Sequence, residues 1–314
     1  MQRHTRRDFL KTTGAAAAAA GLGQFGAGGP VVKAAERKYD ISLAGWSLHR
    51  TIGDGEGKTP QLDMPKLARD EFDIGAIELV NQMMPASDAA YVKQLGKNAA
   101  DNDVDIILIM IDREGSVGAA ERDERIDAVQ RHSRWIDIAA DLGCHTIRLN
   151  WAGAPENVME DEGALDDFIN RSVRAFSILC DRGDEKDINV TIENHGGPSS
   201  HIGALERLMK AVDHERFGTL PDFGNFPRDE SGKHSVDIYD SIDRMMPYAK
   251  AVSAKCYDFD DAGNETTLDF ERIMKLVVDK HDYHGHIGIE YEGNRLSEFD
   301  GIKACKKLLE RLRG

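Results

Sequence analysis

The chain has few of the features that mark membrane-spanning or nucleic-acid-binding proteins. No run reaches the roughly 18 consecutive apolar residues of a transmembrane helix. Acidic residues outnumber basic ones, the formal net charge is −15, and no cluster of Lys and Arg occurs beyond the first residues. Binding to phosphate backbones depends on such clusters, so we expect no nucleic-acid partner.

Cysteine is also scarce. The four cysteines, Cys144, Cys180, Cys256 and Cys305, lie far apart and lack the close pairs of a structural zinc site. Four cysteines allow three complete disulfide pairings, and buried free thiols are an equal alternative. No cysteine lies near residue 34, which argues against a lipid anchor, and no linker rich in Pro, Gly or Ser divides the chain after that point. We therefore expect a single domain without a stable membrane anchor.

The first 34 residues have the composition of a targeting segment. Arg6 and Arg7 precede Phe-Leu-Lys and a stretch rich in Ala and Gly over residues 14–29. This pattern resembles a twin-arginine export signal, and residues 32–34 suit cleavage after small side chains. The resemblance implies passage through the twin-arginine machinery to a periplasmic or other extracytoplasmic location. Removal of residues 1–34 takes away five basic residues and one acidic residue, leaving 280 residues with a net charge of −19.

The remainder, residues 35–314, alternates between short apolar runs and longer amphipathic ones. Eight runs have the length and composition of strands: 41–48, 76–80, 104–111, 146–151, 188–193, 217–222, 251–255 and 287–291. Eight others have helical spacing: 64–72, 86–102, 119–142, 164–182, 202–212, 236–246, 268–279 and 297–312. Within 119–142 the charged residues are expected to form a solvated face. This alternation, at this length, predicts an α/β fold of the (β/α)8 TIM barrel class.

Four of the predicted strands end in polar residues suited to metal or proton chemistry: Glu193, Asp222, Lys255 and Glu290. The carboxyl ends of barrel strands meet at one mouth, so acids far apart in sequence can share one ion or substrate. A carboxylate there can bind a divalent cation or remove a proton. We therefore expect an enzyme.

The residues around these acids add donors and flexible backbone. Strand alternation places His195 on the same side as Glu193, and two glycines follow. Asn225 follows Asp222 after a short turn. Their side chains offer hard oxygen ligands, which favour Mg or Mn. Glu292 projects to the same side as Glu290. Two glutamates on one side are expected to face a bound cation or a cationic side chain such as Lys255.

These motifs resemble the xylose isomerase-like barrels grouped as sugar phosphate isomerases and epimerases. The likeness spans nearly all of residues 35–314 and is most specific at Ile-Glu-Asn-His-Gly-Gly (192–197), Asp-Phe-Gly-Asn (222–225), Ser-Ala-Lys (253–255) and Gly-Ile-Glu-Tyr-Glu-Gly (288–293). The resemblance implies a divalent metal, Mn or Mg with Zn as the alternative, held by Glu193, Asp222 and Glu290. Where the family has His-x-Lys on strand seven, this chain has Ser253, which is expected to weaken metal binding unless another group replaces the imidazole.

The resemblance also implies the chemistry. Glu193 and Glu290 would move a proton at the carbon next to a polarised carbonyl of a sugar. The other residues expected to contact a carbohydrate substrate are Trp46, His49, Glu78, Arg148, Asn150, His195, Asn225, Lys255 and Glu292. Trp46 could instead be a core residue, and Arg148 could instead form an ion pair with a structural acid.

Three functions remain open at this point. The first is an exported isomerase or epimerase for an unphosphorylated sugar or keto-sugar, because phosphorylated sugars are scarce outside the cytoplasm and no phosphate cradle is evident. The second is a lyase on keto-glycosides that uses the same carboxylates. The third is a carbohydrate-binding barrel without catalysis, which the change at Ser253 favours. An abasic-site endonuclease of the same barrel class is excluded by the few His ligands and the acidic surface.

Overall fold

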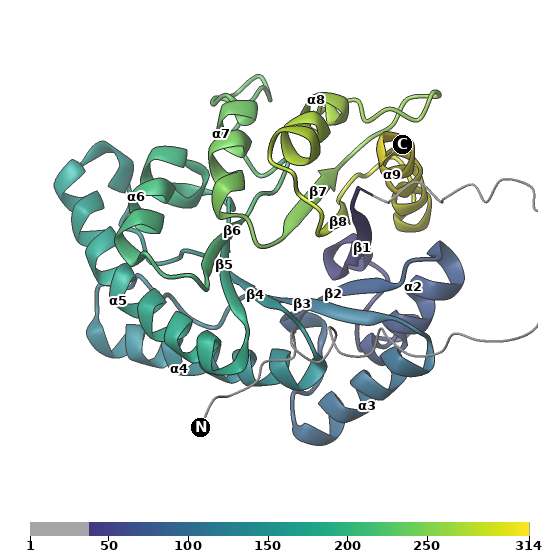
Figure 1. Ribbon diagram of the computed structural model, residues 1–314, viewed down its shortest axis with the longest axis horizontal. Coiled ribbons are helices and arrows are strands. Elements are labelled where there is room, and N and C mark those ends of the chain that lie inside the picture. Colours follow the sequence, from purple (N-terminus) through teal and green to yellow (C-terminus); the bar gives the residue numbers. More distant parts are fainter. Residues whose placement is uncertain (1–37, 314) are drawn as a thin grey trace, which may run out of the picture. The chain divides into compact units, whose positions relative to one another are not determined.

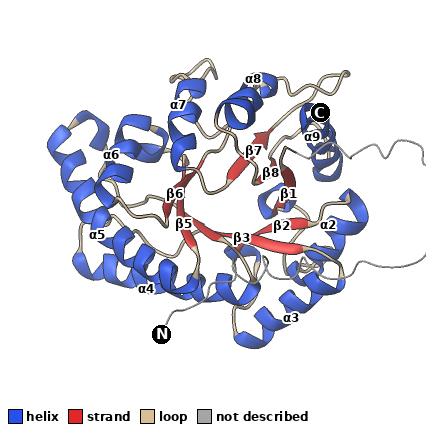
Figure 2. Ribbon diagram, in the orientation of Figure 1, coloured by secondary structure: helices blue, strands red, loops and turns tan. Residues whose placement is uncertain are grey.

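The computed structural model describes residues 38–313, which form a closed ring of parallel strands surrounded by helices (Figure 2). The expected export signal lies outside the described residues. The strands are β1 (Asp40–Ala44), β2 (Ala76–Val80), β3 (Asp105–Ile111), β4 (Thr146–Leu149), β5 (Asn189–Glu193), β6 (Phe217–Leu220), β7 (Val252–Cys256) and β8 (His286–Tyr291). Their order in the sheet is β6-β5-β4-β3-β2-β1-β8-β7.

Each strand is followed by a helix on the outside of the ring (Figure 1). These helices are α2 (Met64–Phe72), α3 (Ala89–Asp101), α4 (Arg122–Leu142), α5 (Glu162–Lys186), α6 (Ile202–Val212), α7 (Ile238–Met245), α8 (Phe270–Met274, continued by a π-helical turn over Lys275–Lys280) and α9 (Glu298–Arg313). Within residues 38–313, no helix combines the length and the apolar character needed to cross a bilayer. The (β/α)8 barrel predicted from the sequence is confirmed.

All eight predicted strands are present, with bounds that differ by a few residues. The largest difference is in the first, where the strand ends at Ala44 and Gly45–Leu48 form a 3-10 turn. A Cβ at Gly45 would lie 3.2 Å from the carbonyl oxygen of Glu78 and 3.1 Å from a methyl group of Val80. A side chain at this position would need Val80 or β2 to shift by a few tenths of an ångström, so glycine suits the close approach of the turn to β2. Trp46 therefore lies on a turn and packs against the inner core.

Strand alternation divides the apolar side chains into two cores. On β2, Ile77 and Leu79 pack against the surrounding helices, whereas Ala76 and Val80 join a smaller cluster inside the barrel. Glu78 shares the inward face of that strand. The interior is thus filled partly by small apolar residues and partly by charged ones, which is the arrangement that places ionisable groups at the mouth.

The ring closes at a short seam between β6 and β7. Two isolated parallel bridges join the strands, at Thr219 with Ala249 and at Asp222 with Ser253. The amide of Ser253 donates to the carbonyl of Pro221 (3.0 Å), and the amide of Phe223 donates to the carbonyl of Ser253 (3.1 Å). Asp222 and Ser253 are consequently held opposite each other at the carboxyl end of this seam.

The last helix packs unusually close to the sheet at Gly301. A Cβ at this position would lie 2.4 Å from two ring atoms of the buried Tyr291 on β8. Replacing Gly301 by alanine is expected to lower the free energy of unfolding by about 2 kcal/mol, because neither the ring nor the helix can move without disturbing the core. Urea unfolding of the variant measures this loss.

Gly96 in α3 provides the matched control for that substitution. Its nearest neighbour would be a methyl group of Leu142 at 3.6 Å, an ordinary contact distance. Alanine at Gly96 is expected to raise the stability by about 0.5–1 kcal/mol through helix propensity alone. Equal effects at Gly96 and Gly301 would contradict the close packing of α9 on β8.

Candidate active site

Three acidic side chains meet inside the barrel mouth: Glu193 from β5, Glu290 from β8 and Asp222 from the turn after β6. Glu193, Asp222 and Glu290 each offer one carboxylate oxygen, and these three atoms lie within 4.8 Å of one another. Their side chains are 1%, 0% and 2% exposed. We refer to these three residues as the carboxylate cluster. The structure brings together the acids that the strand ends predicted.

Local hydrogen bonds fix the orientation of Asp222. Its Oδ1 accepts from the amides of Gly224 and Asn225, both at 2.8 Å, which closes the turn after β6. The side chain of Asn194 bonds both to the amide of Asp222 (2.8 Å) and to its carbonyl (3.0 Å). Asn194 thereby ties the end of β5 to the end of β6. The sequence did not identify this residue, since its position next to Glu193 placed it on the other side of the strand.

Ser253 and Lys255 on β7 bridge the remaining oxygens of the cluster. Ser253 Oγ lies 2.8 Å from Asp222 Oδ2 and 2.7 Å from Glu290 Oε2. Lys255 Nζ lies 2.8 Å from Glu290 Oε1, 3.1 Å from Glu292 Oε1 and 3.8 Å from Asp222 Oδ2. A hydroxyl group carries a single proton, so Ser253 can donate to only one of its two carboxylates. The second close contact calls for a proton or a cation between Ser253 and the other acid.

The pKa values of the two acids diverge accordingly. Burial, together with the charges of Glu290 and Glu193, raises the pKa of Asp222 well above its usual range despite the opposing charge of Lys255. Burial acts on the pKa of Glu290 in the same direction, but the charge and hydrogen bond of Lys255 and the bond from Ser253 outweigh it and lower that pKa. Glu290 is therefore the ionised member of this pair.

Arg148 on β4 supports the cluster from the other side. Its side chain is 1% exposed, with Nε 2.7 Å from Glu193 Oε2 and Nη1 2.7 Å from Asp112 Oδ1. Asn150 donates to the same oxygen of Asp112 at 2.7 Å, and Asn225 donates to Glu193 Oε1 at 2.6 Å. Arg148 thus forms ion pairs with two acids, one of them Glu193 of the carboxylate cluster, and its contact with a substrate stays a prediction. Asp112, just beyond β3, was not identified from the sequence.

Glu78 on β2 lies close enough to Glu193 and Glu290 for their charges to act on it, and within the described chain it forms no ion pair, although the charge of Arg148 also reaches it. It accepts a 2.6 Å hydrogen bond from Ser42 Oγ, and a Cβ at Gly288 would lie 2.3 Å from its Oε1. Burial, and to a lesser extent the charges of Glu290 and Glu193, raises the pKa of Glu78 to about 7 against the hydrogen bond from Ser42. A glycine on β8 is what leaves room for this carboxyl group.

The raised pKa of Glu78 predicts a pH dependence of stability. The unfolded carboxyl ionises near pH 4.5 and the folded one near pH 7, so stability falls as the pH rises through this window. The loss amounts to about 3 kcal/mol above pH 7. Glutamine at this position can still accept the hydrogen bond from Ser42 but does not ionise. Replacing Glu78 by glutamine is therefore expected to remove this pH-dependent loss of stability.

Urea unfolding at pH 5 and pH 8, with a chelator present, measures the effect of the Glu78→Gln substitution. The difference in unfolding free energy between the two pH values should shrink in the variant by about the stated amount. An identical difference in both proteins would mean that Glu78 ionises normally in the folded state.

The other expected substrate contacts lie nearer the rim. Glu292 is 36% exposed and reaches Lys255. His195 is exposed and lies close enough to Asp112 for its charge to affect the pKa of that acid. His49 bonds through Nδ1 to the carbonyl of Trp46 at 2.7 Å and lies 3.5 Å from the buried Glu298. Within residues 38–313, no hydrogen bond or ion pair joins His49 to the carboxylate cluster. His49 and Trp46 thus occupy the loop after β1 at the same end of the barrel.

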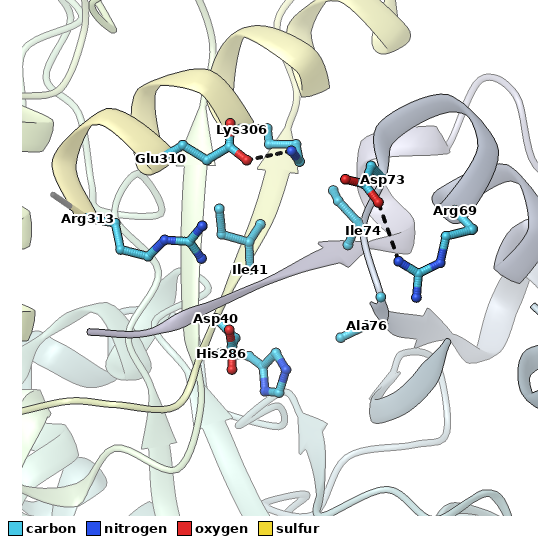
Figure 3. Close-up of a pocket in the computed structure, with 11 residues that line it drawn as sticks. Asp40, Ile41, Arg69, Asp73, Ile74, Ala76, His286, Lys306, Glu310 and Arg313 are labelled. Carbon is cyan, nitrogen blue, oxygen red and sulfur yellow. Dashed lines mark hydrogen bonds and ion pairs between the residues drawn. The ribbon is translucent and has the colours of Figure 1, made fainter. Parts of the chain in front are cut away.

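A separate cavity of about 330 Å³ opens at the opposite end of the barrel (Figure 3). It is lined by Asp40, Ala76 and His286, the first residues of β1, β2 and β8. Two of its basic side chains are paired with acids four residues further along the chain, as Figure 3 shows for Arg69 with Asp73 and Lys306 with Glu310. The convergent carboxylates are all at the other mouth, where barrels place their chemistry.

The donor set at the carboxylate cluster fits a divalent cation. The acids gathered here are Glu78, Asp112, Glu193, Asp222, Glu290 and Glu292, against two basic side chains, Arg148 and Lys255. Glu193 Oε2 is buried and accepts no hydrogen bond of good geometry, and its one close charged neighbour is Arg148 Nε at 2.7 Å. Hard oxygen donors of this kind suit Mg or Mn. A divalent cation would offset part of the excess negative charge of the carboxylates. It would also take the place of the second proton that the two close contacts of Ser253 require.

Comparison with known proteins agrees with this geometry. The model of the xylose isomerase-like TIM barrel family matches residues 67–313, and a twin-arginine translocation signal matches residues 3–23, which indicates export. A curated relative, the C-glycoside deglycosidase alpha subunit of Arthrobacter globiformis, is 41% identical over 133 residues. That match covers 37% of this chain and 38% of the relative, so it spans less than half of either protein.

Solved structures share the fold over most of the chain. The 3-keto-D-glucoside 4-epimerase of E. coli has a TM-score of 0.64 at 13% identity, covering 88% of this chain and 99% of that one. A xylose isomerase-like TIM barrel protein of Mycobacterium smegmatis, in complex with magnesium, has a TM-score of 0.60 at 18% identity, covering 88% and 95%. The family match extends over far more than half of the sequence. The chain belongs to the xylose isomerase-like TIM barrel family.

Proposed function

We propose that this chain is an exported, periplasmic enzyme that moves a proton at the carbon next to the carbonyl of an unphosphorylated sugar or keto-sugar. The proposal is carried by the burial of Glu193, Asp222 and Glu290 in one cluster. The two basic side chains beside the cluster do not balance the charge of the acids around it. The similarity to a 3-keto-D-glucoside 4-epimerase supports an epimerase or isomerase.

The chain's own groups can perform the proton transfer. Glu290 is available as the base, because Lys255 and Ser253 keep it ionised. Glu193, fixed by Arg148 and Asn225, would deliver a second proton, taken up from water, to the opposite face of the carbon, and Glu290 would then release the first proton to water. The ammonium of Lys255 and the amide of Asn225 can donate to sugar oxygens. The carboxylate cluster would hold the divalent ion, which supplies Lewis-acid polarisation of the carbonyl when bound.

The excess of acid also bears on the substrate. Arg148 and Lys255 are already engaged by carboxylates, so a phosphate group at the mouth would meet repulsion without a free basic partner among the site residues. A neutral sugar meets no such penalty. This supports an unphosphorylated substrate.

A lyase acting on keto-glycosides is the second candidate, because the curated relative is named a C-glycoside deglycosidase alpha subunit. Removal of a proton beside a keto group would begin that reaction too, and the bond to the aglycone would then break. The two candidates share Glu193 and Glu290. They differ in whether a second product appears.

Deuterium incorporation tests the proposal. The purified protein, loaded with Mn²⁺, is incubated in heavy water with ketoses, 3-keto-glucosides and a keto-C-glycoside, and carbon-bound deuterium is followed by NMR. Incorporation with an epimerised sugar supports the first candidate, and release of an aglycone supports the second. Sugar binding without exchange or product would overturn the enzyme and leave a binding barrel.

A further inference from the structure

A groove of about 330 Å³ lies between α4 and α5 on the outside of the barrel, two helices that run side by side in Figure 1. Its basic lining consists of Arg122 and Arg125 from α4 and Arg171 and Arg174 from α5. Its apolar lining includes Ile126 and Ile178. We call this feature the α4–α5 groove. From the sequence, the charges on residues 119–142 were expected to face solvent only.

The charge of the groove is opposite to that of the chain. No acidic residue lines it, although the whole sequence carries a net charge of −15. Among residues 38–313, none of the four guanidinium groups takes part in an ion pair with another described residue. Acids do lie nearby: Asp123 and Glu124 share the first turn of α4 with Arg122, and the charge of Asp167 acts on Arg171. None of them lines the groove, so the lining itself is positively charged.

Two of the arginines are held in place by backbone carbonyls. Arg125 Nη1 donates to the carbonyls of Ala119 and Ala120, both at 2.7 Å, and Arg171 Nε donates to that of Gly118 at 2.6 Å. The guanidinium of Arg171 lies 5.2 Å over the ring of Phe168, and its Nη2 is buried without a hydrogen-bond partner. Burial, and then the charge of Arg125, lowers the pKa of Arg171, whereas the charge of Asp167 raises it. The guanidinium groups of Arg125 and Arg171 are thus fixed in the lining of the groove.

The apolar part of the groove is exposed to an unusual degree. Ile126 is 37% exposed and Ile178 is 47% exposed, and they are two of the three large apolar side chains that the described residues expose. The third, Met159, is outside this groove. Apolar surface beside fixed cations is a combination that matches ligands with an apolar body and an anionic group.

We propose that the α4–α5 groove binds a soluble organic anion, with its charged group against Arg125 and Arg171 and its apolar body against Ile126 and Ile178. The volume falls within the range of about 300–1,000 Å³ that is typical of small-molecule sites. The groove lies on the helical exterior of the barrel, so the proposal is independent of the chemistry at the carboxylate cluster.

Calorimetric titration of the purified full chain with octyl phosphate, below its micelle-forming concentration, tests the proposal. Octyl phosphate should bind one per chain, more weakly at high salt, and at least about tenfold more tightly than inorganic phosphate or octyltrimethylammonium. Replacing Arg171 or Arg125 by glutamine should weaken binding by about tenfold or more, because each removes a charged donor.

Arg131 supplies the matched control. It lies on α4, does not line the groove and pairs with Asp127 at 4.0 Å, so Arg131→Gln should bind octyl phosphate as the parent does. Equal binding by all the variants, equal binding of the cationic amphiphile, or no binding at about 1 mM would overturn the proposal. Binding to vesicles of anionic phospholipid without binding of free octyl phosphate would also overturn it and identify a membrane-docking surface.

Discussion

Replacing Glu290 by glutamine is expected to lower the rate of solvent-deuterium incorporation by about 10²–10⁴-fold, the range typical of a lost general base. Glutamine has nearly the same shape as glutamate but cannot accept the proton. The substitution also removes the negative charge that Lys255 contacts at 2.8 Å, so Lys255 would turn more strongly toward Asp222 and Glu292. Single-turnover exchange measured by NMR, at saturating Mn²⁺ and substrate, isolates the chemical step.

Glu292 is the matched comparison, because it directly follows the same strand and contacts the same lysine but is 36% exposed. Glu292→Gln should lower the exchange rate by less than about tenfold, since a solvated rim contact contributes little. Glu193→Gln should resemble Glu290→Gln if the two glutamates act as a pair. Activity retained in both of those variants would remove the carboxylate cluster from the chemistry.

Much of the fold could be predicted because the signals are local and repeated. The apolar run 105–111 marks a strand covered on both faces, and the structure has β3 there with six of its seven residues buried. Helix beginnings were less well predicted, since they depend on single caps. Asp88, for example, accepts from the amides of Ala90 and Tyr91, so α3 begins at Ala89 rather than at residue 86.

The acids of the site could be predicted because each one ends a strand, and the barrel brings strand ends together. Asp112 directly follows β3, so the same rule could have found it, whereas Asn194 and Ser42 could not be found because their roles arise from partners on neighbouring strands. Ser42 bonds to Glu78 across 36 residues, and Asp112 bonds to Arg148 across the same separation. Nothing in the local pattern at either residue indicates such a partner.

The arginines of the α4–α5 groove illustrate the same limit. Along the sequence, Arg122 and Arg125 are separated from Arg171 and Arg174 by most of α4, β4 and the start of α5. Only the packing of α4 against α5 gathers them into one groove. A search for runs of basic residues does not detect a cluster built in this way.

Ser253→His is expected to tighten Mn²⁺ binding by about 10–100-fold, the range by which groups supporting a metal site alter its affinity. Ser253 Oγ lies within 2.8 Å of oxygens from both Asp222 and Glu290, so a side chain at this position reaches two of the three carboxylates. Imidazole would add a neutral nitrogen donor, which first-row transition metals prefer to a hydroxyl group. It is also the group that the family pattern has at this position.

Calorimetry with Mn²⁺, after removal of metal with a chelator, measures the affinity, and thermal unfolding of each variant checks that the buried site still folds. Ser253→Ala is the control, because it removes the hydroxyl group without adding a donor and should bind Mn²⁺ no more tightly than the parent. Titration in buffers of different ionisation enthalpy gives a second readout. In the parent, Mn²⁺ should displace a proton, since burial keeps the pKa of Asp222 high in the metal-free site. If Ser253→His folds with the affinity of the parent, the side chain at residue 253 does not contact the ion. If neither protein binds Mn²⁺, Lys255 rather than a metal ion occupies the centre of the carboxylate cluster, where its ammonium group lies 2.8 Å from Glu290 Oε1 and 3.8 Å from Asp222 Oδ2.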